Sequence, residues 1–160
     1  MIGLTRIDSL KLRCRTNSRT HVVFQSRRAG GDAGRHPVRK RILVVDDTGF
    51  IRDLLRLILE DSGYEVYEAH HGGEAIAQMR DLLPDLVITD LMMPVISGPQ
   101  LVHHLRSDRR TASVPILVLS SNPDAAQVAR SADAVVGKPF DRASLVATVN
   151  SLVLRQERTG

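Results

Sequence analysis

Short apolar runs alternate along the chain with longer segments whose apolar residues recur at helical spacing. Runs such as Ile42-Leu43-Val44-Val45 are typical of buried parallel strands. The predicted strands are 42–45, 64–69, 86–89, 116–119 and 134–136. The predicted helices are 50–59, 74–83, 99–106, 123–130 and 142–154. Asp141 is the expected N-cap of the last helix. The alternation predicts an α/β domain with a parallel sheet covered by helices on both faces.

Three acidic residues lie at the ends of two predicted strands: Asp46 and Asp47 follow residues 42–45, and Asp90 follows residues 86–89. The carboxyl ends of parallel strands open on one crevice, where open α/β sheets bind ligands, so the three carboxylates are expected to converge. Two like charges about 4 Å apart repel by roughly 4 kcal/mol at an effective dielectric of 20. Such a cluster therefore takes up protons or binds a cation, and Mg²⁺ is the predicted ion because it prefers oxygen ligands.

Charge divides the chain into two parts. Residues 1–41 contain eleven Lys or Arg and two acidic residues, whereas residues 42–160 contain eleven Lys or Arg and sixteen acidic residues. Residues 1–40 also lack a sustained apolar period, so they are predicted to be a disordered basic extension. The domain is expected at 41–155, followed by a short tail at 156–160.

The basic extension has other interpretations. Its Lys and Arg side chains could contact the phosphates of a nucleic acid or a membrane surface. Because it contains a single aromatic residue, Phe24, nucleic acid is not the expected partner. It could also be translated sequence upstream of a start near Val38, or an organellar transit peptide.

Cysteine content and apolar stretches bear on the cellular compartment of the protein. It contains one cysteine, Cys14, and therefore no intrachain disulfide. It has no apolar stretch of about 18 residues and no secretory signal pattern. We therefore expect a cytoplasmic protein that does not act at a membrane.

Four motifs lie at the ends of predicted strands. They are Val44-Val45-Asp46-Asp47, Asp90-Leu91-Met92-Met93-Pro94 with Gly98, Val114-Pro115-Ile116 leading to Ser120, and Lys138-Pro139-Phe140. In this order they resemble the CheY-like receiver domain of two-component response regulators, and the resemblance covers residues 41–154. It implies the flavodoxin-like fold, a doubly wound sheet of five parallel strands in the order 2-1-3-4-5 within three αβα layers.

The resemblance also implies roles for the acidic residues. Asp90 would be the phosphoacceptor, whose carboxylate attacks a phosphoryl group in line and carries it as an aspartyl phosphate. Asp47, Asp90 and the backbone carbonyl of Met92 would hold Mg²⁺ directly, and Asp46 would act on the ion through a bound water. The metal would offset the charge that grows on the transferred oxygens.

On the phosphate side, the resemblance assigns Lys138 as the cation and Ser120 as the hydroxyl that contact the phosphoryl oxygens. Lys138 is the only lysine after residue 40, and the resemblance implies that the Lys138-Pro139 bond is cis. Two departures from the family pattern concern the output of the domain. Val135 replaces an aromatic residue that often reports phosphorylation, and the segment between Ser120 and Lys138 is about one helical turn shorter than usual.

The predicted function is that of a stand-alone receiver. The chain would accept a phosphoryl group from a sensor histidine kinase or a histidine phosphotransfer protein and signal through a protein partner that the sequence does not identify, in an oligomeric state left open. It would catalyse only its own phosphorylation and dephosphorylation, and is not predicted to be an enzyme with an external substrate. A phosphatase of the haloacid dehalogenase type would need a second aspartate where this chain has Met92. The alternatives are a degenerate receiver-like interaction module and a nucleic-acid-binding regulator that acts through the basic extension.

Overall fold

The computed structural model describes residues 39–121 and 131–157, and every structural statement below refers to these residues. The strands are β1 (Arg41–Val45), β2 (Glu65–Ala69), β3 (Leu86–Asp90), β4 (Ile116–Ser120) and β5 (Ala134–Gly137). The helices are α1 (Gly49–Asp61), α2 (Gly72–Gln78), α3 (Gly98–Ser107) and α5 (Arg142–Glu157). None of the helices in these two ranges has the length and apolar character needed to cross a membrane.

The five strands form one parallel sheet in the order β2-β1-β3-β4-β5, which confirms the predicted topology. The direction of winding changes at β1, because β1 pairs with β2 on one side and with β3 on the other. In such sheets, ligands bind outside the carboxyl ends of the strands at this switch point. The register aligns those ends, since Val45 lies opposite Thr89, and Ser120 lies opposite Gly137.

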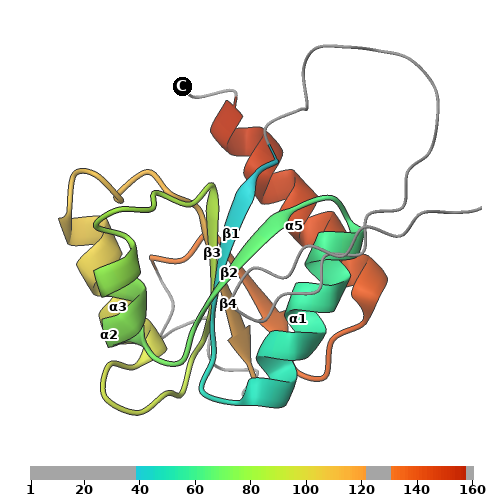
Figure 1. Cartoon of the computed structure of the whole chain (residues 1–160), viewed down its shortest axis with the longest axis horizontal. Coiled ribbons are helices and arrows are strands. Elements are labelled where there is room, and N and C mark those ends of the chain that lie inside the picture. Colours follow the sequence, from blue (N-terminus) through green and yellow to red (C-terminus); the bar gives the residue numbers. More distant parts are fainter. Residues whose placement is uncertain (1–38, 122–130, 158–160) are drawn as a thin grey trace, which may run out of the picture. The chain divides into compact units, whose positions relative to one another are not determined.

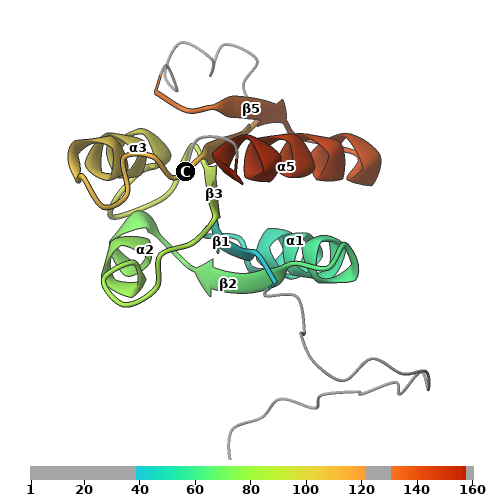
Figure 2. The same ribbon diagram turned by 90° about the horizontal axis from the view of Figure 1, so that it is seen from above.

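Helices cover both faces of the sheet. α1 and α5 lie on one face, and α2 and α3 lie on the other (Figure 1, Figure 2). Alternate residues of β1 divide between the two cores: Ile42 and Val44 pack with α1 and α5, whereas Leu43 and Val45 pack with α2 and α3. β3 and β4 are buried along their full length, while β2 and β5 at the edges are partly exposed. The strands that carry the acidic residues thus lie at the centre of the domain.

The second helix is shorter than the sequence predicts. α2 ends at Gln78, whereas the apolar spacing predicted a helix to residue 83. Beyond Gln78, Arg80 and Asp81 donate their backbone N–H groups to carbonyls three residues earlier, so the chain continues as turns rather than as an α-helix. The predicted helices on either side are confirmed, and the helix predicted at 123–130 lies outside the described residues.

Two expected features lie where the chain passes from β5 to α5. The Lys138-Pro139 bond is cis, as expected. The carboxylate of Asp141 accepts the backbone N–H of Ser144 at 2.9 Å, which satisfies one of the free amides at the start of α5 and confirms the predicted cap. Hydrogen bonding from Ser144 also holds the pKa of Asp141 below its ordinary value.

Candidate functional site

Four predicted site residues lie at the carboxyl-terminal ends of neighbouring strands. Asp46 follows β1, Asp90 closes β3, Ser120 closes β4, and Lys138 follows β5. These strands are neighbours in the sheet, in the order β1-β3-β4-β5. The topology therefore brings together side chains up to 92 positions apart in the sequence.

Asp90 is buried, and both of its carboxylate oxygens are held by the protein. Its Oδ1 accepts a hydrogen bond from Nζ of Lys138 at 2.5 Å. Its Oδ2 accepts one from the backbone N–H of Met92 at 2.7 Å. Because one donor is a charged side chain and the other is fixed in the backbone, the carboxylate has a defined orientation at the end of β3.

Asp46 is almost fully buried, and each of its polar atoms has a partner. Its N–H donates to the carbonyl of Ala69, and its own carbonyl accepts Nη1 of Arg52 at 2.6 Å. Oδ1 accepts the backbone N–H of Thr48 at 2.9 Å, and Oδ2 accepts Nζ of Lys138 at 2.8 Å. Both carboxylate oxygens of Asp46 are thus held by donors of the protein, and its role through a bound water stays a prediction.

Lys138 joins the two buried carboxylates, since its ammonium contacts both Asp46 and Asp90. Burial alone would lower the pKa of Lys138, but the hydrogen bonds and negative charges of the two aspartates raise the pKa above its ordinary value. The side chain is therefore cationic at neutral pH. One positive charge between two carboxylates offsets the repulsion that the sequence predicts for this cluster.

Asp47 differs from Asp46, because its carboxylate is exposed and forms no hydrogen bond or ion pair with another described residue. Across residues 39–121 and 131–157, no three acidic, His or Cys side chains form a ready metal site. The ammonium of Lys138 instead lies between two of the expected oxygen ligands. The donor set still fits a hard cation, since every predicted ligand is an oxygen and no described residue competes for the carboxylate of Asp47.

Ser120 and Met92 lie at the same end of the strands, and their roles at the phosphate and the metal stay predictions. Ser120 is buried, and its carbonyl accepts the backbone N–H of Lys138 at 2.7 Å, so the predicted hydroxyl and the predicted cation lie on hydrogen-bonded neighbours. The Met92 side chain is 77% exposed, and its backbone contacts the carboxylate of Asp90. On β5, Val135 is partly exposed and offers no aromatic ring.

Arg52 belongs to the site, although no motif in the sequence reveals it. It is the fourth residue of α1, and its guanidinium reaches back to the carbonyl of Asp46. A contact between a side chain and a backbone carbonyl leaves no periodic signal in the sequence. The sequence does contain one hint, which is an arginine at the start of a predicted helix. The helix dipole disfavours positive charge in the first turn, so such an arginine suggests a local partner.

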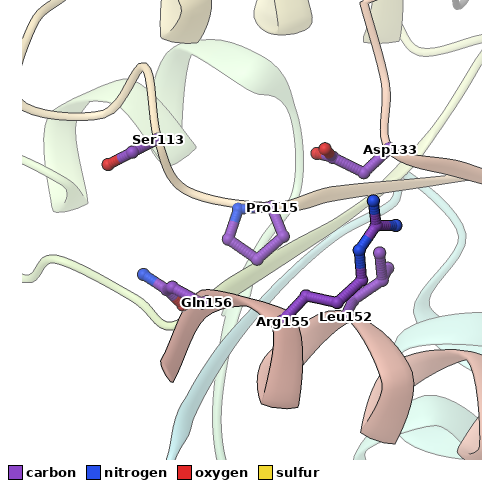
Figure 3. A pocket seen from close by; sticks show the side chains of 6 residues that line it. All are labelled: Ser113, Pro115, Asp133, Leu152, Arg155 and Gln156. Carbon is purple, nitrogen blue, oxygen red and sulfur yellow. The ribbon is translucent and has the colours of Figure 1, made fainter. Parts of the chain in front are cut away.

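A separate cavity lies at the opposite end of the strands. It has a volume of about 160 Å³ and is lined by Ser113, Pro115, Asp133, Leu152, Arg155 and Gln156 (Figure 3). These residues precede β4 and β5 or belong to the last turns of α5. None of them is a predicted site residue, so the candidate site remains the cluster of side chains at the carboxyl ends of the strands.

Comparison with known proteins gives a consistent picture. Residues 42–150 match the family described as response regulator receiver domain. The chain is 39% identical over 122 residues to the DNA-binding dual master transcriptional regulator RpaA of Synechocystis. This match covers 74% of this chain and 51% of RpaA. The chemotaxis response regulator CheY4 of Vibrio cholerae has a TM-score of 0.68 at 32% identity, covering 72% of this chain and 99% of CheY4. The response regulator TrrA of Thermotoga maritima, solved in complex with Mg²⁺-BeF, has a TM-score of 0.66 at 36% identity, covering 71% of this chain and 98% of TrrA.

The two kinds of relative differ in length. The chain spans about half the length of the DNA-binding regulators that it matches, whereas its similarity to CheY4 and TrrA covers nearly all of those chains. The part shared with every one of them is the five-stranded domain that carries the site.

Proposed function

Because this chain belongs to the response regulator receiver domain family, we propose that Asp90 accepts a phosphoryl group from a sensor histidine kinase or a histidine phosphotransfer protein. The observation that carries this proposal is the environment of the Asp90 carboxylate. It lies at the end of a central strand, with one oxygen 2.5 Å from a lysine ammonium and the other 2.7 Å from a backbone N–H. A carboxylate held in this way is oriented for attack on a group that approaches from the crevice.

The proposed step is a phosphoryl transfer. A carboxylate oxygen of Asp90 forms a bond to phosphorus while the bond from phosphorus to a histidine nitrogen breaks, and the leaving imidazole keeps the electron pair. Lys138 contributes a positive charge beside the attacking oxygen, where an anionic phosphoryl group would otherwise be repelled by two buried carboxylates. Ser120, whose backbone is bonded to that of Lys138, would offer its hydroxyl to a phosphoryl oxygen.

Mg²⁺ is the cofactor that we propose for this step. Asp47, Asp90 and the backbone carbonyl of Met92 would hold it, with Asp46 acting through a bound water. When bound, the ion would offset negative charge shared by the carboxylates and the phosphoryl oxygens. The all-oxygen donor set supports this choice, as does the Asp47 carboxylate, which has no partner among the described residues; the related TrrA was solved in complex with Mg²⁺-BeF.

The output would be a change in binding to a protein partner. The chain would turn over no external substrate, because the proposed chemistry begins and ends on its own Asp90. Three exposed apolar side chains support a role in protein contacts: Phe50 at the start of α1, and Met92 and Val95 in the loop that follows Asp90. Their exposed fractions lie between 74% and 78%, so three apolar side chains are open to solvent in the segments that follow β1 and β3.

The decisive experiment is incubation of the full chain with acetyl phosphate and MgCl₂, followed by intact-mass measurement. We expect wild type to gain the mass of one phosphoryl group only when Mg²⁺ is present. Asp90→Asn should gain none, because the amide lacks the nucleophilic oxygen. Asp81→Asn is the matched control, since Asp81 is an exposed aspartate in the turns after α2, and it should label as wild type does. Labelling of Asp90→Asn at the wild-type level would refute the assignment.

A further inference from the structure

We infer that Arg52 is a positioning residue that orients Asp47 for Mg²⁺ binding. The inference rests on the proposed function, since it takes Asp47 to be a magnesium ligand. Its basis is the 2.6 Å hydrogen bond from Nη1 of Arg52 to the carbonyl oxygen of Asp46. This bond joins the first turn of α1 to the point where the chain leaves β1.

The carbonyl that Arg52 holds determines where Asp47 points. A peptide unit is planar, so the carbonyl of Asp46 and the N–H of Asp47 turn together. Fixing the direction of that carbonyl therefore fixes the peptide plane that places the N and Cα atoms of Asp47, and rotation about the N–Cα bond sets the rest. The other half of the Asp46-Asp47-Thr48 turn is held by the bond from the Thr48 N–H to Oδ1 of Asp46.

Asp47 has no other anchor in the described chain. Its carboxylate is exposed and contacts no described partner, whereas Asp46 and Asp90 are each held by two donors through their side chains. The backbone alone orients Asp47. A loss of backbone definition at the Asp46-Asp47 peptide would therefore affect Asp47 more than either of the other two carboxylates.

The place of Arg52 in its helix is unfavourable unless it has a local partner. A cation in the first turn opposes the helix dipole, and α1 has no acidic residue in its first turn that would compensate. The guanidinium also lies over Gly49, where an added Cβ would be 3.7 Å from Nη2 of Arg52. The hydrogen bond to Asp46 supplies the partner and gives the side chain a defined path along the start of α1.

The charge of Arg52 and its proposed contact predict opposite effects on magnesium binding. A cation at this edge repels Mg²⁺, so if its charge alone mattered, removing Arg52 would strengthen binding. If Arg52 orients Asp47, removing it weakens binding, because groups that position metal ligands contribute about tenfold or more to metal affinity. The sign of the change therefore separates the two roles.

The test is calorimetric titration of the metal-free full chain with MgCl₂, without a phosphodonor. Arg52→Ala should bind Mg²⁺ about tenfold more weakly than wild type. Arg52→Lys, which keeps the charge and a donor, should recover part of the affinity. Arg56→Ala is the matched control, because Arg56 lies one turn further along α1 and pairs with Asp53 and Glu68 instead of with the backbone of Asp46. It should bind as tightly as wild type or slightly more tightly.

Amide hydrogen exchange of the metal-free chain gives a second readout that does not depend on the ion. Arg52→Ala should speed exchange of the Thr48 amide, because a freed Asp46-Asp47 peptide weakens the bond that Thr48 makes to Asp46. Exchange within β3 should not change. Should Arg52→Ala fail to fold, Arg52→Gln keeps the aliphatic stem with a shorter neutral donor, and the same weakening of Mg²⁺ binding is expected from it.

Two outcomes would overturn the inference. If Arg52→Ala binds Mg²⁺ as tightly as Arg56→Ala while wild type binds the ion and labels on Asp90, Arg52 has no positioning role and the proposed function stands. If wild type binds no Mg²⁺, the magnesium site and the role of Arg52 fail together. Weaker binding by Arg52→Ala, with Arg56→Ala unchanged, supports the inference.

Discussion

Val95 shows how a single residue can hold the loop beside the site in a costly conformation. Its φ is 68°, and it is the one non-glycine residue with a positive φ in the described part of the chain. Ile96 donates its N–H to the carbonyl of Pro94 at 2.8 Å, so Val95 is the centre of a three-residue turn of the strained kind. The Val95 side chain is exposed and gains little from packing. A β-branched residue here costs about 1–2 kcal/mol relative to glycine.

We therefore expect Val95→Gly to stabilise the protein by about 1 kcal/mol, the relief of strain less the entropy that glycine loses on folding. The free energy of unfolding from urea denaturation would measure the gain. Val95→Ala is the control, since it shortens the side chain but keeps the Cβ that disfavours this conformation, and it should gain much less. Equal stability of the two variants would contradict the strain argument.

Site residues could be predicted from sequence where a strand end marks them. Asp46, Asp90 and Lys138 each follow a predicted strand, and the sheet order then brings them together. Their contacts could not be predicted in the same way. The bridge that Lys138 makes to two aspartates, and the reach of Arg52 to a carbonyl, depend on side-chain conformations across separate elements.

At the scale of elements, the loop from β3 to α3 decides the position of Asp90. Gly98 begins α3 directly against the end of β3: a Cβ added there would lie 2.3 Å from the carbonyl oxygen of Asp90 and 2.9 Å from Cα of Leu91. The N–H of Gly98 also donates to the carbonyl of Leu91 at 3.1 Å, which closes the loop. Only a residue without a side chain fits this approach.

Gly98→Ala should therefore destabilise the fold by about 2–3 kcal/mol, because backbone atoms cannot move aside as a flexible side chain can. It should also slow labelling by acetyl phosphate, since any relief of the clash displaces Asp90. Thermal unfolding and intact-mass labelling would measure the two effects. Gly49→Ala is the control, because its added Cβ meets nothing closer than 3.7 Å, and it should be neutral or slightly stabilising. A Gly98→Ala variant as stable as wild type would contradict this close approach.

Element type was easier to predict than element length. Buried strands such as β3 and β4 read as apolar runs because both faces are covered by helices. The predicted end of α2 was wrong, because the chain beyond Gln78 forms turns in which Met79 reaches the core while Leu83 is exposed. Met79 is the C-cap of α2 and is buried, and its N–H still donates to the carbonyl of Ala75, so the helical spacing extends to the residue where the helix ends.

At the scale of the whole molecule, the buried apolar core and the excess of positive charge lie in different parts of the chain. Every buried hydrophobic residue of the described structure lies between Ile42 and Val153. Residues 1–37 contain eight Lys or Arg and two acidic residues. Residues 38–160 contain the other fourteen Lys or Arg and sixteen acidic residues, which gives them a net charge of −2. Residues from Pro37 onward also form a compact unit of their own. Stability and site chemistry should therefore depend on the second part, and attraction to polyanions on the first.

This division predicts the behaviour of a shortened chain that contains residues 38–160. Its urea midpoint and its labelling by acetyl phosphate should match those of the full chain, because it keeps every buried hydrophobic residue of the described structure and all the proposed site residues. Its retention on a heparin column should fall sharply, since the net charge changes from +4 to −2. A lower urea midpoint or slower labelling would mean that residues 1–37 take part in the domain. Unchanged retention on heparin would mean that the polyanion contacts lie on the domain, and would remove the basic extension as a nucleic-acid-binding arm.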